Sequence, residues 1–364
     1  MSFFSPSGYE NFTYQEKNFT KIYLPFDSKK NSKKIIIELN SLFLTERKWL
    51  DISIVKRIKL YITISDFITN WFFTIRGFKA THKEKQRILY LAAIMPLFDD
   101  LTDSLKIPSK DIIKDLKSTN NTLHPTIPVI RYLYFKLIEN CSEHFIFTFH
   151  RALEVQDKSI TQLQEKKLKT KAIKDITYEK GGISIFLFRL ILDHSLRKNE
   201  EKSIYELGYL IQLINDMFDI HKDYLNKQQT LFTNATSLKP CFNEYKNTLD
   251  NVITNFMSLD YDHSNSIKAL SKISTITSRA QVCIEQLLAC EKSTQGSFKI
   301  EFYERKQLIC DMDTIKNIFR CLQKKHLELL PFLSFQNQIS LKPIKFLQIK
   351  WMWDTMVPMN LYCH

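Results

Sequence analysis

At 364 residues the chain is long enough for one large domain or two ordinary ones, and its 44% apolar residues can form a substantial core. It contains only 6 glycines and 10 prolines, which is few for a β-rich protein. The formal net charge is +13, but the lysines are scattered and no zinc-finger, RNA-recognition or basic-zipper pattern occurs, so the sequence predicts no nucleic-acid partner. An anionic membrane surface or a polyanionic small substrate is compatible with this charge.

The cysteines and the ends of the chain favour a cytoplasmic protein. The seven cysteines form no CxxC pair and are odd in number, which argues against zinc and against a disulfide framework. The first residues lack the basic start and apolar run of a signal peptide. The longest uncharged apolar run, Ile88 to Phe98, has 11 residues, too few to span a bilayer. We therefore expect reduced thiols and no stable membrane insertion.

Apolar residues recur at spacings of three and four along most of the chain, which predicts an all-α protein, a single large helical bundle of about a dozen helices. Residues 1–32 are polar and aromatic and predict an extended arm, and residues 33–364 predict one domain, without a repeat or a linker. In chain order we expect helices as follows: two or three between 35 and 80, one over 83–105 with a kink at Pro96, one over 128–155, one over 204–225, and four or five afterwards.

An acidic cluster ends the apolar stretch before residue 105. The segment "LFDDLTDSL" (97–105) carries Asp99, Asp100 and Asp103 with no basic residue among them. Removing such carboxylates from water costs several kcal/mol or more each unless a positive charge compensates them. The segment is therefore either a solvated helix end or a place where a cation binds.

A second acidic cluster lies on the helix predicted over 204–225. Asn215, Asp219 and Asp223 stand at i, i+4 and i+8, which places them on one helix face, and Gln212 and Asp216 flank them. Two such clusters facing each other would form a dense oxygen cage, and oxygen ligands without His or Cys favour Mg²⁺. Mg²⁺ is usually bound by one or two carboxylates together with substrate phosphate oxygens. Carboxylates four residues apart are also common on solvated helices, so one cluster alone does not indicate a metal site, whereas two clusters together favour one.

The segment "EKGG" adds a basic residue between the two clusters. Lys180 could reach the same phosphate, and Gly181 and Gly182 would let the backbone approach closely or let the helix break. Each glycine weakens a helix by about 1 kcal/mol, so two in succession call for a reason.

These residues carry a resemblance to the class I isoprenoid synthases. "DDLTD" (99–103) resembles their DDxxD motif, and "QLINDMFDIHKD" (212–223) resembles their second metal motif. It is similar both to the Gln-x-x-Asp-Asp-x-x-Asp pattern of trans-prenyl diphosphate synthases and to the Asn-Asp-x-x-Ser-x-x-x-Glu triad of terpene synthases. "EKGG" (179–182) resembles their diphosphate-binding Lys-Thr/Gly segment. The resemblance spans roughly residues 85–225 and implies an all-α isoprenoid synthase bundle, with both motifs at the mouth of a central apolar cavity, three Mg²⁺ ions and a prenyl diphosphate substrate.

The sequence departs from the chain-elongating branch of this superfamily. No Arg-Arg pair follows the first motif, and no early Gly-Lys-Arg segment is found. The first hypothesis is therefore a terpene synthase, which ionises one prenyl diphosphate and lets the carbocation cyclise or be quenched. A trans-prenyltransferase that couples two isoprenoid diphosphates is the alternative, and a non-catalytic helical binding protein is a second one. A homodimer stays open.

Further residues receive roles from this hypothesis. Lys180, Arg189 and Arg305 would donate charge-assisted hydrogen bonds to the diphosphate, and "FYERK" (302–306) is similar to the Arg-Tyr pair of terpene synthases in the reverse order. Ile94 and Met95 would set the cavity depth, by resemblance to the chain-length position of prenyl diphosphate synthases. Aromatic faces can stabilise a carbocation without reacting, although ordinary core packing is the alternative for each of them: Trp71, Phe72, Phe73, Phe186 and Phe188. The Trp-containing tail over 345–364 would cap the bundle or dock on a membrane.

Overall fold

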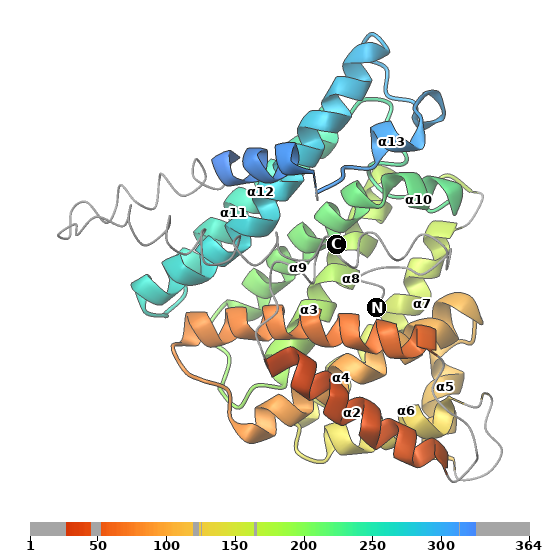
Figure 1. The fold of residues 1–364 in the computed structure, drawn as a ribbon, viewed down its shortest axis with the longest axis vertical. Coiled ribbons are helices and arrows are strands. Elements are labelled where there is room, and N and C mark those ends of the chain that lie inside the picture. The colour runs from red at the N-terminus through yellow and green to blue at the C-terminus, as the bar shows by residue number, and fades with distance from the viewer. Residues whose placement is uncertain are drawn as a thin grey trace, which may run out of the picture.

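A computed structural model of the chain describes residues 27–44, 52–118, 124, 126–163, 166–312 and 314–324. These residues form helices and no strand, which confirms the predicted all-α class (Figure 1). None of the helices in these ranges combines the length and the apolar character that crossing a bilayer requires. Most of the predicted arm and the whole Trp-containing tail lie outside the described residues.

The elements follow one another in this order: α2 (Asp27–Leu44), α3 (Ile52–Arg76), α4 (His82–Asp99), η1 (Asp100–Ser104), α5 (Ser109–Lys117), α6 (Ile127–Ile138), α7 (Glu143–Ser159), η2 (Ile160–Leu163), α8 (Thr170–Leu190), α9 (Glu200–Phe218), α10 (Ile220–Leu225), α11 (Lys239–Ser258), α12 (His263–Ser293), η3 (Ile300–Phe302) and α13 (Arg305–Leu308). The α8 and α9 helices lie in the middle of the bundle, with α3 and α4 on one side and α11 and α12 on the other (Figure 1).

The glycines of α8 serve helix packing. A Cβ atom on Gly181 would lie 2.2 Å from the carbonyl oxygen of Gly208 in α9, and one on Gly182 would lie 2.2 Å from the ring of Tyr205. The two helices can therefore approach closely only because these positions lack side chains. Since α8 is also continuous through them, the expected helix break is wrong, whereas the expected close approach of backbone is found, with α9 as the partner. A contact of these glycines with phosphate stays a prediction.

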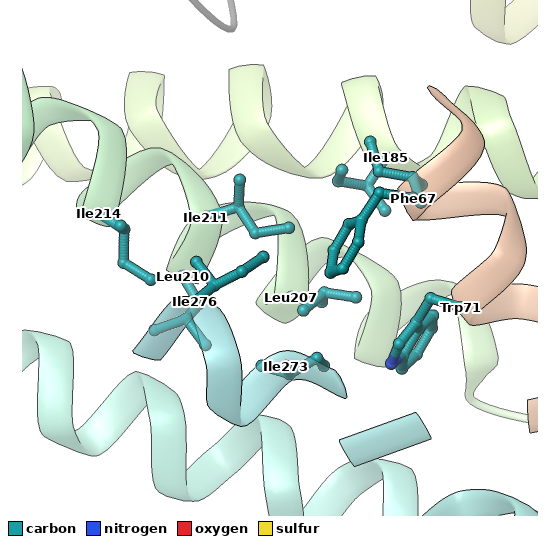
Figure 2. A pocket seen from close by; sticks show the side chains of 10 residues that line it. Phe67, Trp71, Ile185, Leu207, Leu210, Ile211, Ile214, Ile273 and Ile276 are labelled. Atoms are coloured by element: carbon teal, nitrogen blue, oxygen red, sulfur yellow. The ribbon is translucent and has the colours of Figure 1, made fainter. Parts of the chain in front are cut away.

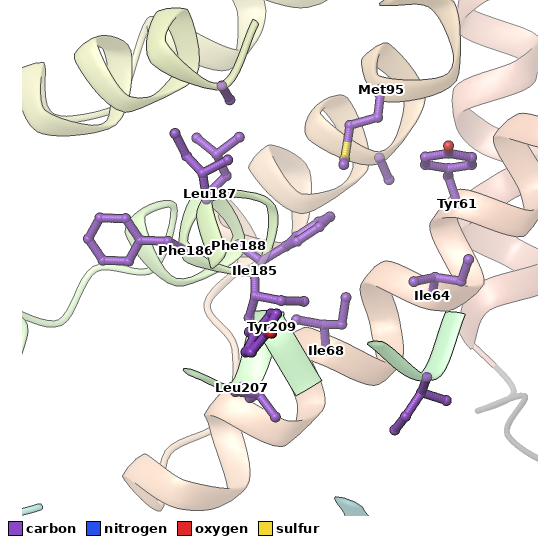
Figure 3. Packing of buried hydrophobic residues seen from close by; sticks show 14 of the residues in the cluster. Tyr61, Ile64, Ile68, Met95, Ile185, Phe186, Leu187, Phe188, Leu207 and Tyr209 are labelled. Atoms are coloured by element: carbon purple, nitrogen blue, oxygen red, sulfur yellow. The ribbon is translucent and has the colours of Figure 1, made fainter. Parts of the chain in front are cut away.

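Residues of α3, α4, α8 and α9 build one shared apolar core. Ile64, Ile68, Met95, Ile185 and Leu207 are buried side chains from these four helices (Figure 3). Burying a large aliphatic side chain stabilises a fold by about 1.5–3 kcal/mol. This core fixes the relative positions of the helices that carry the two acidic clusters.

The helix predicted over 83–105 is present but changes its hydrogen-bond pattern at the acidic cluster. Pro96 lies inside α4 and provides no backbone N–H. The helix then widens into the π-helical turn η1 over the "DDLTDS" segment, where the N–H of Leu105 donates to the carbonyl of Asp100 over 3.1 Å. Such π-type turns inside helices are frequent at functional sites.

Two boundaries differ from the sequence-based expectation. The helix predicted over 128–155 is divided into α6 and α7, because Ser142 caps a new helix by accepting a 3.2 Å hydrogen bond from the N–H of Phe145. At the other end of the bundle, α2 begins at Asp27, inside the segment predicted as an extended arm. The first difference arises from local capping that the apolar spacing alone does not reveal.

The start of α4 offers a test of such local capping. Thr81 accepts a 3.1 Å hydrogen bond from the N–H of Glu84, whose carboxylate accepts from the N–H of Thr81 over 2.8 Å, forming a capping box. We expect Thr81→Ala to lower the free energy of unfolding by about 1 kcal/mol. Urea denaturation measures this, with Ser41→Ala on α2 as a surface control; a value equal to wild type would contradict the role of the cap.

Candidate functional site

The first acidic cluster receives its positive charge from α3. Arg57 forms an ion pair with Asp100, and its Nη2 lies 3.9 Å from Oδ2 of Asp99. The hydroxyl of Tyr61 donates to Oδ2 of Asp99, which is fully buried. The side chain of Asp103 lies outside the described residues. The compensating cation expected from the sequence is therefore supplied, at least for Asp99 and Asp100, by a residue of the chain itself.

Neighbouring side chains stabilise the positive charge of Arg57. Burial by itself lowers the pKa of Arg57, but Tyr61, Asp99 and Asp100 outweigh burial and raise the pKa above its ordinary value. Arg57 thus carries its positive charge at any physiological pH. An ion pair of this kind, once buried, costs much to break unless another cation replaces it.

The second acidic cluster consists of Asp216, Asp219 and Asp223, with Asn215 half-buried beside them. The exposed fractions of the three aspartates are only 2%, 5% and 3%. The predicted single helix is interrupted at Asp219, which ends α9 and precedes α10. The i, i+4 relation nevertheless persists, since the N–H of Asp219 donates to the carbonyl of Asn215 over 2.9 Å and that of Asp223 to Asp219 over 2.8 Å.

Two of these carboxyl groups have strongly perturbed pKa values. Burial raises the pKa of Asp216 to about 7, against a 2.8 Å hydrogen bond from Nε2 of Gln212 and the charge of Lys180. Burial also raises the pKa of Asp223 well above its ordinary range, and the charges of Asp219 and Asp216 raise it further. The ionised carboxylates therefore repel one another, and a bound cation would stabilise the ionised form of each of them.

Two lysines belong to this cluster. Lys180 on α8 is buried, and its charge acts on both Asp216 and Asp223. Nζ of Lys222 lies 3.3 Å from Oδ2 of Asp219. Because a side chain on a helix leans toward its N-terminus, Lys180 extends along α8 toward the end of α9 where the aspartates lie. Lys180 therefore lies near the second cluster, and its predicted contact with a phosphate stays a prediction.

The donor set fits magnesium only in part. No three His, Cys, Asp or Glu side chains within the described ranges lie close enough together to hold one metal ion, so the single dense cage expected from the sequence is not formed there. The second cluster still has the composition that Mg²⁺ uses when substrate phosphate supplies the remaining oxygens, namely a few carboxylates and an amide oxygen. The first cluster would have to exchange Arg57 for a metal ion.

The described residues enclose an apolar pocket between α3, α8, α9 and α12 (Figure 2). Its volume is about 20 Å³, which leaves room for about one water molecule. The pocket is lined by aliphatic and aromatic side chains: Phe67, Ile68, Trp71, Ile185, Leu207, Leu210, Ile211, Ile214, Ile273 and Ile276. A prenyl chain would fit there only after side chains move apart.

Of the predicted wall residues, Trp71 alone lines this pocket. Its indole N–H donates to the carbonyl of Ala269 over 2.8 Å, which fixes the ring between α3 and α12. Phe72 and Phe186 are buried elsewhere in the core, Phe186 against the rings of His144 and Tyr205. Ile94, Met95 and Phe188 are also buried in the core, and Phe73 is half-buried, with the guanidinium carbon of Arg76 4.6 Å from its ring centre. Core packing therefore accounts for most of the predicted aromatic wall.

The two predicted arginines lie in very different places. Arg189 is buried at the C-terminal end of α8, where its Nε donates to Glu200 over 2.6 Å and its Nη1 to the carbonyl of His194 over 2.9 Å. This is roughly 14 Å along the helix from Lys180, so the expectation that Arg189 contacts a diphosphate is wrong. Arg305 is exposed at the start of α13, and its charge lowers the pKa of His221 on α10, although burial contributes more. Arg305 thus lies near the second cluster.

The relative placement of the two clusters is visible at the level of the helices. The end of α4 that leads into α5, and the short helix α10, both lie on the right-hand side of the bundle in Figure 1. The expected face-to-face arrangement of the carboxylates stays a prediction.

Sequence reasoning missed Arg57, Tyr61 and Gly208. Arg57 and Tyr61 are four residues apart on the buried face of α3, and a basic residue within an otherwise apolar helical face was a usable signal.

Comparison with known protein families, with curated proteins and with solved structures finds no match.

Proposed function

We propose that the protein is a class I isoprenoid synthase of the terpene synthase type, which releases diphosphate from one linear prenyl diphosphate in the presence of Mg²⁺. The observation that supports this most is the buried cluster of Asp216, Asp219 and Asp223 with Lys180. Three carboxylates kept from water at the end of an apolar helix pair suit a site that binds a metal and a phosphate together.

The residues of this cluster divide the work between metal and anion. Asn215 together with one or two of Asp216, Asp219 and Asp223 would hold Mg²⁺, whose chemistry is to neutralise charge that develops on a leaving diphosphate. Lys180 would donate to a diphosphate oxygen, and the exposed Arg305 would do so from α13. Gln212 holds Asp216 through its 2.8 Å hydrogen bond and so positions one ligand.

The apolar pocket between α3, α8, α9 and α12 would hold the prenyl chain. Phe67, Trp71 and the leucines and isoleucines of α9 present no nucleophile that a carbocation could capture. The face of Trp71 could stabilise a cation by about 0.5–2 kcal/mol. Substrate binding must enlarge this pocket, and closure of the site on the diphosphate would expel water.

One observation favours a second candidate function. Arg57 already neutralises Asp99 and Asp100, as a structural ion pair would in a helical binding protein without catalysis. A prenyltransferase is the remaining alternative, and it differs by consuming a second isoprenoid diphosphate.

The test is an incubation of the purified protein and Mg²⁺ with prenyl diphosphates of ten, fifteen, twenty and twenty-five carbons, each with and without isopentenyl diphosphate. Organic extracts are examined by mass spectrometry. A hydrocarbon or alcohol from a single substrate, abolished by EDTA, is the expected result. Longer diphosphates that appear only with isopentenyl diphosphate would replace the proposal with a prenyltransferase, and the absence of any product would refute the catalytic function proposed here.

A further inference from the structure

Cysteines gather where α12 meets the chain segment that follows it. Cys283 lies in the interior of α12 and is fully buried, whereas Cys310 lies in the irregular segment after α13 and is 5% exposed. Cys290, two turns further along α12, donates from its thiol to the carbonyl of Gln307 over 3.4 Å. All three cysteines are free thiols. Two thiols of α12 therefore face the segment that carries the third.

The thiols of Cys283 and Cys310 are in direct contact. The S–H of Cys283 donates a hydrogen bond to the sulfur of Cys310, and this bond, followed by burial, raises the pKa of Cys283 well above its ordinary value. The same bond lowers the pKa of Cys310, against burial, and the charge of Arg320 lowers it further, against that of Asp311. Because the thiolate is the nucleophilic form of cysteine, Cys310 is the more reactive member of the pair.

The backbone around Cys310 is held against α12 by a side chain of that helix. Nε2 of Gln286 donates to the carbonyls of Gln307 and Ile309 over 2.8 and 3.0 Å. Sulfur atoms that already touch can bond after rotation of their side chains and a small adjustment of irregular backbone, which Cys310 has on both sides. A disulfide between Cys283 and Cys310 therefore requires no separation of helices.

We propose that Cys283 and Cys310 form a reversible disulfide when the protein meets hydrogen peroxide, and that this bond fastens the segment after α13 to α12. The Cys310 thiolate attacks a peroxide oxygen and the O–O bond breaks, which gives Cys310 sulfenic acid and hydroxide, and the hydroxide takes up a proton to form water. The sulfur of Cys283 then attacks the sulfur of Cys310, the S–O bond breaks, and the departing hydroxide leaves as water with the S–H proton. Each sulfur loses one electron, the peroxide is reduced to two waters, and a dithiol reductant reverses the bond.

The disulfide would act on a segment that lies next to the second acidic cluster. The short helix α13 contacts both α12 and α10 (Figure 1), and α10 carries Asp223. In a reducing compartment, protein disulfides are usually transient and redox-sensing. An oxidant would therefore restrict the motion of α13 beside this cluster for as long as the bond lasts. Formation of the bond requires no turnover and does not depend on the proposed function.

The test treats the full chain with hydrogen peroxide, blocks the remaining thiols with iodoacetamide and identifies tryptic peptides by mass spectrometry without reduction. We expect a linked pair of peptides that cover residues 280–292 and 307–316, which dithiothreitol separates. Because the first peptide contains both Cys283 and Cys290, Cys290→Ala is the matched control and should keep the link, whereas Cys283→Ala should lose it. No linked pair in wild type, or a linked pair in Cys283→Ala, would overturn the proposal.

Two further measurements test the order of the steps and the fastening. In Cys283→Ala the sulfenic acid of Cys310 has no thiol to react with, so we expect dimedone to label Cys310 about tenfold more than in wild type. Labelling of Cys283 in Cys310→Ala, with none of Cys310 in Cys283→Ala, would overturn the assigned order. In wild type, which needs no substitution, oxidation should slow amide hydrogen exchange over residues 305–312 about tenfold, and unchanged exchange would overturn the fastening.

Discussion

Gly208→Ala is expected to lower the free energy of unfolding by about 3 kcal/mol. The new Cβ would lie 2.2 Å from the carbonyl oxygen of Gly181 and 2.6 Å from the Cα of Gly182. These are backbone atoms of α8, which cannot rotate away as a side chain would, so α8 and α9 must separate. Urea denaturation measures the change as a lower midpoint at unchanged slope.

Gly296→Ala is the control for this experiment. Gly296 has open space around it but a φ angle of +84°, so alanine there adds about 1 kcal/mol of backbone strain and no clash. A Gly208→Ala variant that is no less stable than Gly296→Ala would show that the close approach of α8 and α9 is not a requirement of the fold.

Asp216→Asn is expected to change how stability depends on pH. Burial raises the pKa of Asp216 in the folded protein to about 7 from its ordinary value of 3.8. The folded state therefore holds this proton more tightly than the unfolded state, and the protein loses stability as pH rises from about 4 to about 7. Each tenfold difference in proton affinity is worth about 1.4 kcal/mol, so the loss amounts to about 4 kcal/mol.

Asparagine cannot ionise and keeps an oxygen for the hydrogen bond from Gln212. The free energy of unfolding of the variant minus that of wild type should therefore be about 4 kcal/mol larger at pH 8 than at pH 4. Unfolding measured in urea at both pH values, without divalent cations, tests this. The control Asp250→Asn, at an exposed position on α11, should show the same pH dependence of unfolding as wild type. If Asp216→Asn also shows the wild-type pH dependence, ionised Asp216 does not destabilise the folded protein.

The sequence predicted those features of the fold that depend on local spacing. The three- and four-residue recurrence of apolar residues identified the helical class, and the i, i+4 spacing of Asn215, Asp219 and Asp223 identified the second cluster. These features survive because hydrogen bonds within one segment determine them. The break at Asp219 changed the helix boundary without separating the residues.

Features that depend on contacts between distant segments escaped prediction. Arg57 lies 43 residues before Asp100, and only the packing of α3 against α4 brings them together. The glycines of α8 were expected to let backbone approach closely, but their partner, Gly208, belongs to another helix and was missed. Arg189 was assigned to the site by its charge, whereas the buried Glu200 holds it at the far end of α8.

In the proposed function, the carboxylates at the end of α9 hold the metal that activates a diphosphate. The most direct test measures diphosphate release from the preferred prenyl diphosphate by wild type, Asp219→Asn and the control Asp250→Asn at saturating Mg²⁺. We expect Asp250→Asn to match wild type and Asp219→Asn to lose about a hundredfold or more in kcat, because removing a group that stabilises developing charge typically has an effect of this size. Equal rates of release by wild type and Asp219→Asn, with circular dichroism unchanged, would contradict the account.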